Sequence, residues 1–153
     1  MNYLKGITVS LKNLSLMGLT VSVAALVTLI FRKSLFAHEP VGITVQALAA
    51  LLMLWARLTF GRRSFHANAI PTEGGVITTG PYKFFRHPIY ASLLYFIWAG
   101  ILSHLSLLNC LLGLVPIAGL TIRMLAEERL VTEKYPEYST YASHTKRVIP
   151  FIL

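Results

Sequence analysis

The sequence contains no aspartate, and its only acidic side chains are six glutamates. This absence excludes triads and paired-carboxylate sites built on Asp, and it disfavours magnesium-dependent phosphoryl transfer, whose metal ions are normally held by carboxylates. Charged residues of all kinds make up 13% of the chain, whereas about a quarter is usual in a soluble domain. Hydrophobic residues make up 55%, so the composition is that of a membrane protein.

Cysteine is also scarce, because Cys110 is the only thiol in the sequence. A single cysteine cannot form a disulfide within the chain, and its place in an apolar run predicts a small buried side chain. The five histidines show no metal-ligand spacing such as His-Glu-x-x-His, so no metal site is expected.

Long apolar segments dominate the rest of the chain. The first two run from about residue 14 to 31 and from about residue 41 to 58, close to the roughly 20 residues that a membrane-spanning helix needs. The apolar stretch 88–122 is too long for one helix, so we interpret it as two helices with a turn at 104–107. The sequence therefore predicts an all-α, polytopic membrane protein with about four transmembrane helices, as a single domain over residues 1–153.

Basic residues are distributed unevenly around these segments. The chain has 14 Lys and Arg against 6 acidic residues, a net charge of +8. With four spans, all of these basic residues except Arg32 and Lys33 fall on the side that holds both termini. Because cytoplasmic loops collect Lys and Arg, both termini are predicted to be cytoplasmic. The charges flank apolar runs rather than forming a solvated stripe, which favours membrane lipids over nucleic acid as partners.

The polar segment before the third apolar run combines turn-forming glycines with functional side chains. From Gly80 it reads Gly-Pro-Tyr-Lys-Phe-Phe-Arg-His-Pro-Ile-Tyr. Glycine lets the backbone approach a ligand closely. Arg86, His87 and Tyr90 lie where a membrane helix begins, so their polar groups need hydrogen-bonding partners or contact with water. The alternative is an interfacial anchor, with Arg86 reaching lipid phosphates and Tyr90 in an aromatic belt.

A second polar cluster follows the fourth apolar run. Arg123 and Glu127 are four residues apart, so on a helix they share a face and can pair. Glu128 points about 100° away from Glu127, so at most one of the two glutamates lies on the Arg123 face. The alternative is an ordinary solvated helix with surface ion pairs. The tail beyond it mixes tyrosines with basic residues and by itself indicates only an interfacial anchor.

Together these clusters resemble one protein family. The series Gly-Pro-Tyr-x-x-x-Arg-His-Pro-x-Tyr at 80–90, Glu-Glu at 127–128 and Tyr-x-x-Tyr at 138–141, ending near Arg147 and Pro150, is similar to the isoprenylcysteine carboxyl methyltransferase and phospholipid methyltransferase superfamily. The resemblance covers about residues 60–151. It implies an S-adenosylmethionine-dependent methyltransferase whose cofactor site is formed by the cytoplasmic loop and the C-terminal tail.

The resemblance also implies roles for individual residues. Arg86 and Arg123 are expected to be catalytic, with Arg123 on the substrate side. The residues similar to the family's cofactor-binding positions are Val76, Ile77, Tyr82, His87, Pro88, Ile89, Tyr90, Glu127 and Glu128. The implied substrate is lipophilic, and the leading expectation is a carboxyl methyltransferase of the isoprenylcysteine type. The alternatives are a phospholipid amine N-methyltransferase and a non-catalytic membrane module that binds a lipid or a partner.

Overall fold

The computed structural model of the chain describes residues 2–61 and 74–149. Its described elements are α1 (Asn2–Phe31), α2 (Pro40–Phe60), the short 3-10 helix η2 (Gly80–Lys83), α3 (Pro88–Ser103), α4 (Leu107–Lys134) and α5 (Tyr138–His144). No strand occurs in these two ranges, where the one extended pairing is an isolated bridge between Phe85 and Lys146. The predicted all-α class is confirmed, and the turn expected at 104–107 separates α3 from α4.

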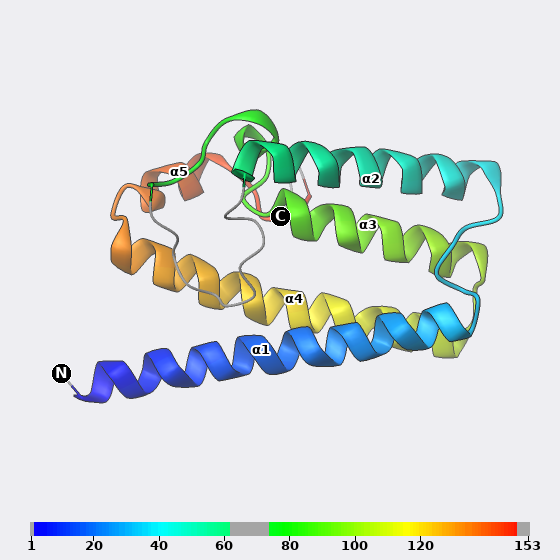
Figure 1. Cartoon of the computed structure of the whole chain (residues 1–153), viewed down its shortest axis with the longest axis horizontal. Helices are drawn as coiled ribbons and strands as arrows, with labels where there is room; N and C mark the ends of the chain where they lie inside the picture. The colour runs from blue at the N-terminus through cyan, green and yellow to red at the C-terminus, as the bar shows by residue number, and fades with distance from the viewer. Residues whose placement is uncertain (1, 62–73, 150–153) are drawn as a thin grey trace.

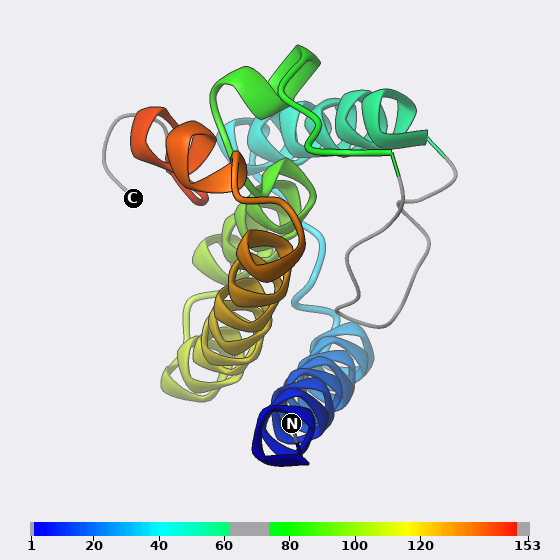
Figure 2. The ribbon, with the colours of Figure 1, turned by 90° about the vertical axis from the view of Figure 1, so that its left-hand side faces the viewer.

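The four long helices run back and forth along one axis (Figure 1). α1 packs against α4 and α2 packs against α3, with a smaller contact between α3 and α4. The helices therefore form a row of neighbours in the order α2, α3, α4 and α1, which Figure 2 shows from the end of the bundle. The beginning of α1 and helix α5 lie at the same end of this row.

Three of these helices are long and apolar enough to cross a membrane, namely α1 from residue 13, α2 and α4. α3 is also apolar but has only 16 residues, so it is about 24 Å long at 1.5 Å per residue. Many large apolar side chains on α1, α2 and α4 are exposed, as expected for helices that face lipid. The protein is thus an integral membrane protein with several spans.

The fourth apolar run ends at about residue 122 in the sequence, but the helix that contains it is longer. α4 has 28 residues and continues through Pro116 and through the polar segment 123–134. At about 42 Å it exceeds the roughly 30 Å hydrocarbon core of a bilayer. Its last turns project past the first turn of α3 (Figure 1), and α5 lies beside the projecting part. The two polar clusters meet at this offset, beside the last turns of α4.

Small residues bring α1 and α4 into close contact. A Cβ atom added to Gly18 would lie only 2.9 Å from the carbonyl oxygen of Gly119. Ser22 donates its hydroxyl to the Gly18 carbonyl at 2.7 Å, so it is satisfied within its own helix. Helix contacts of this kind are typical of membrane proteins, where association depends on close packing of backbones.

A buried glutamine fixes the opposite end of the bundle. The Gln46 amide nitrogen donates to the carbonyl oxygens of Leu35 at 2.8 Å and Phe96 at 3.0 Å, and its oxygen accepts from Ala37 N–H at 3.0 Å. These bonds satisfy backbone groups in the loop before α2 and in α3, which would otherwise need hydrogen bonds from water. Gln46 therefore ties α2, α3 and this loop together at the end away from the polar clusters.

Candidate active site

The segment before α3 is held in place by the tail. His87 precedes Pro88, which begins α3 and needs no N–H partner there. Arg86 N–H donates to the Lys146 carbonyl at 2.6 Å, and His87 N–H donates to the Arg147 carbonyl at 3.0 Å. This short parallel pairing joins residues 85–87 to residues 146–147 and brings the Arg147 side chain to the site.

Glu128 lies at the centre of a cluster of donors. Its Oε1 is 3.2 Å from Nη1 of Arg86 and 3.1 Å from Nε2 of His87. Arg147 reaches both of its oxygens, with Nε at 3.1 Å and 3.2 Å and Nη2 at 2.9 Å from Oε2. Only 12% of the Glu128 side chain is exposed. Its charge is thus compensated by two guanidinium groups from the loop and the tail.

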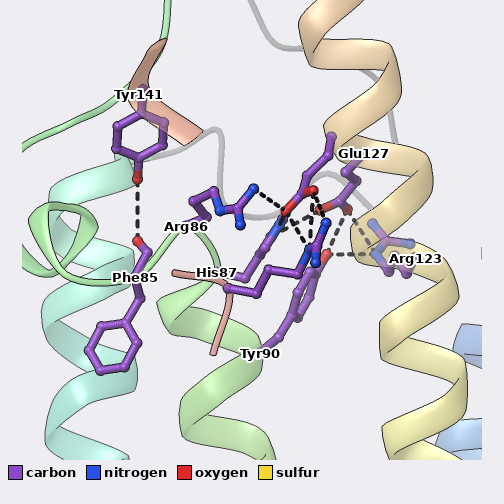
Figure 3. A network of polar contacts seen from close by, with 9 residues as sticks. Phe85, Arg86, His87, Tyr90, Arg123, Glu127 and Tyr141 are labelled. Carbon is purple, nitrogen blue, oxygen red and sulfur yellow. Dashed lines mark hydrogen bonds and ion pairs between the residues drawn. The ribbon is translucent and has the colours of Figure 1, made fainter. Parts of the chain in front are cut away.

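Glu127 has a different set of partners. The Tyr90 hydroxyl donates to its Oε1 at 2.6 Å, and Nε of Arg123 lies 3.0 Å from the same oxygen (Figure 3). Arg123 Nε also donates to the Tyr90 hydroxyl at 2.7 Å. The predicted Arg123–Glu127 pair is confirmed, in agreement with the prediction that at most one of the two glutamates lies on the Arg123 face. Glu127 Oε2 lies 3.8 Å from Nδ1 of His87, which is beyond hydrogen-bond distance.

Aromatic side chains surround these charges. The His87 and Tyr90 rings stack with centroids 5.6 Å apart and an interplanar angle of 17°. Tyr141 of α5 donates its hydroxyl to the Tyr82 carbonyl at 2.7 Å and the Phe85 carbonyl at 3.3 Å. Burial raises the pKa of the Tyr141 hydroxyl to about 12, so it stays protonated and remains a donor near neutral pH. α5 therefore holds the loop that carries the site.

The structure brings together six of the residues that the sequence analysis singled out: Arg86, His87, Tyr90, Arg123, Glu127 and Glu128. The other predicted positions lie around this network. Tyr82 is buried and packs its ring against Phe60 of α2, with centroids 5.5 Å apart. Pro88 is fully buried, whereas Val76, Ile77 and Ile89 are half-buried. The functional roles of all these residues stay predictions.

Arg147 is the residue that sequence reasoning missed. It stands at the end of the family-like series, but no role was assigned to it, because a basic residue in a tail normally indicates an interfacial anchor. Its bonds to Glu128 raise the pKa of the guanidinium above its usual range, so it is a permanent cation here. Arg62, Arg63 and Pro150, which also belong to the predicted cytoplasmic charges or to the family-like series, lie outside the described residues.

The charges of the cluster limit the chemistry that it can perform. Three guanidinium groups, from Arg86, Arg123 and Arg147, face two carboxylates and one imidazole. Across 13–61 and 74–149, no group of three or more His, Cys, Asp or Glu side chains is placed to hold a metal ion. The arrangement offers a carboxylate for a cationic ligand, an imidazole for a proton and guanidinium groups for an anion.

The comparisons with known proteins give one match. A family model described as phospholipid methyltransferase matches residues 37–138. The matched range includes α2, η2, α3, α4 and both glutamates, and it ends before Arg147. No curated protein and no solved structure gives a significant match.

Proposed function

Because the chain belongs to the phospholipid methyltransferase family, we propose that it transfers a methyl group from S-adenosylmethionine to the polar end of a lipid. The observation that carries the proposal is the convergence of Glu127, Glu128, His87 and Tyr90 at one end of the bundle, within the range that the family model matches. Bound S-adenosylmethionine supplies a methyl group on a positively charged sulfur atom. We take residues 1–153 to act as one domain.

The two carboxylates fit a cationic cofactor unequally. Both oxygens of Glu128 already accept from Arg147, and Oε1 also lies beside Arg86 and His87. Glu127 accepts from Tyr90 and Arg123 through Oε1, while its Oε2 points to the side of His87 without a hydrogen bond to it. Its side chain is also more exposed, at 22%. We therefore assign the cofactor's ammonium group to Glu127 and a supporting role to Glu128.

The apolar parts of the cofactor require a different surface. A sulfonium cation is attracted to aromatic faces, and the Tyr90 ring lies next to Glu127. The half-buried Val76, Ile77 and Ile89 are proposed to contact the adenine, with Tyr82 and Pro88 as the buried wall behind them. These residues fit S-adenosylmethionine because they combine a carboxylate with aromatic and apolar groups.

For the methyl acceptor we propose the amine of a phospholipid head group. The family match supports a phospholipid, and an amine is the part of a phospholipid head group that can accept a methyl group. Such an acceptor must lose a proton before its nitrogen can attack, and His87 stands between the two carboxylates. The lipid's acyl chains would remain in the bilayer next to α3 and α4 while the head group enters the site from the cytoplasmic face.

A carboxylate acceptor of the isoprenylcysteine type is the second candidate, because Arg123 favours it. The Arg123 side chain is only 5% exposed and lies one turn before Glu127 on α4. A buried planar guanidinium is well suited to orient a carboxylate. A carboxylate also needs no base, so this reaction would leave His87 without a proton to accept.

Calorimetry on the purified protein in detergent tests the proposal directly. We expect S-adenosylmethionine and S-adenosylhomocysteine to bind, and Glu127→Gln to weaken binding roughly tenfold to a hundredfold, since a charge-assisted contact contributes about 1.5–3 kcal/mol. Glu133→Gln is the matched control, because it removes an exposed ion pair with Arg129 from the same helix. Normal binding in Glu127→Gln would contradict the assignment, and no binding to the wild type would contradict the proposed function.

A further inference from the structure

We propose that His87 accepts the proton of the methyl acceptor on Nδ1, and that Arg147 is a positioning residue that prepares His87 for this task through Glu128. The inference rests on the proposed function with an amine acceptor, because a carboxylate has no proton to lose. It gives the C-terminal tail a role in the reaction. The tail lies beyond the family match, which ends at residue 138.

The hydrogen bond of His87 determines which ring nitrogen is free. Nε2 lies 3.1 Å from Glu128 Oε1. An ionised carboxylate only accepts hydrogen bonds, so the proton of the neutral imidazole must be on Nε2. Nδ1 lies 3.8 Å from Glu127 Oε2 and therefore makes no hydrogen bond to it. In this tautomer Nδ1 carries the lone pair, and it points to the more exposed of the two carboxylates.

Glu128 can impose this tautomer only if it is itself fixed. Arg147 binds it through both Nε and Nη2, and Arg86 approaches Oε1 from the loop. The backbone of Arg147 also accepts from His87 N–H, so the same residue fixes both ends of the histidine. A planar guanidinium with two bonds to one carboxylate restricts its orientation more than a single ammonium does. Arg147 of the tail thus completes the set of contacts that fixes Glu128.

The surroundings of His87 stabilise the proton once it arrives. The ionisable groups around the ring are Arg86 beside it, Tyr90 on α3, Glu127 and Glu128 on α4, and Arg147 in the tail. Arg123 is one step further away, in contact with Tyr90 and Glu127. The imidazolium would lie between two carboxylates, which offsets the repulsion from the guanidinium groups. Transfer from an ammonium to the imidazole leaves the total charge of the filled site unchanged, so no additional charge is buried.

The proposed step is a proton transfer. An N–H bond of the acceptor ammonium breaks, its electron pair stays on nitrogen, and an Nδ1–H bond forms on His87. The nitrogen lone pair is then available for methylation, and the imidazolium returns its proton to water. This arrangement of a carboxylate that fixes a histidine tautomer and stabilises the imidazolium follows the general logic of carboxylate–histidine pairs.

Nitrogen NMR of the protein labelled on histidine tests the arrangement without any turnover. The His87 signals are identified by their loss in His87→Asn. We expect the wild type at alkaline pH to show protonated Nε2 and unprotonated Nδ1, and Arg147→Gln to show a mixture of tautomers. Arg147→Lys should not restore the wild-type pattern. A protonated Nδ1 in the wild type, or unchanged signals in Arg147→Gln, would overturn the inference.

The kinetic test is a pH profile of methyl transfer at saturating cofactor. Turnover of the wild type should fall on the acid side, because a general base must be unprotonated to accept a proton. Arg147→Gln should lower kcat about tenfold and move this acid limb, with little change in cofactor affinity, whereas Arg129→Gln serves as an exposed control. An unchanged profile in Arg147→Gln would overturn this inference but would not contradict the proposed function. If the wild type binds no cofactor, the proposed function fails instead, while the NMR result still stands.

Discussion

Glu127 and Glu128 are neighbours in the sequence but have separate surroundings. Glu127 lies with Tyr90 and Arg123 between α3 and α4, whereas Glu128 meets the loop and the tail through Arg86 and Arg147. Their separation follows from the 100° step between consecutive helix residues. The family resemblance placed both glutamates among the cofactor-binding positions without deciding which of them contacts the cofactor. The contacts of the tail with Glu128 suggest how the two roles divide.

Arg123 offers a prediction for the chemical step. Arg123→Lys keeps a positive charge beside Glu127, so cofactor binding should survive. A lysine lacks the planar guanidinium whose Nε contacts both Tyr90 and Glu127, so turnover should fall by about tenfold or more. Cofactor affinity and turnover of this variant are compared with those of Arg129→Lys, an exposed substitution on the same helix. Wild-type turnover in Arg123→Lys would exclude a carboxylate acceptor held by this residue.

At the scale of the helices, the close approach of α1 and α4 gives a prediction for stability. Gly119→Val would place side-chain atoms against the backbone of Gly18, so α1 and α4 must move apart. Overpacking of this kind typically costs about 1–3 kcal/mol, and for a chain of this size the thermal midpoint in detergent should fall by several degrees. Ala118→Val, on the exposed face of the same helix, is the matched control. Equal midpoints for the two variants would contradict the close packing.

The helices were predictable to different degrees. The apolar runs at 14–31 and 41–58 correspond to α1 and α2, because a long apolar run has few alternatives to a membrane helix. The extension of α4 to Lys134 was missed, because an apolar run ends at the first charges while a helix does not. The position of Arg147 was also unpredictable, since the pairing of residues 85–87 with 146–147 joins segments that are far apart in the sequence.

The distribution of charge gives a prediction for the topology of the whole molecule. The beginning of α1 and helix α5 lie at the same end of the bundle (Figure 1), and Arg32 and Lys33 lie between α1 and α2 at the other end. We predict that the end with the site is cytoplasmic, with both termini on that side. In a Cys110→Ser background, an impermeant thiol reagent added outside intact cells should label Lys33→Cys but not Ser143→Cys. Labelling of Ser143→Cys from outside would refute this orientation.

The most direct test of the whole account is methyl transfer to membrane lipid. Membranes that contain the wild-type protein are incubated with methyl-labelled S-adenosylmethionine, and the extracted lipid is treated with base to distinguish an N-methyl group from a methyl ester. We predict label in a phospholipid head group as a base-stable N-methyl group, with Glu127→Gln membranes strongly reduced and Glu133→Gln membranes unaffected. Release of the label as methanol would identify the carboxylate acceptor instead. Absence of label from the lipid of wild-type membranes would contradict the account.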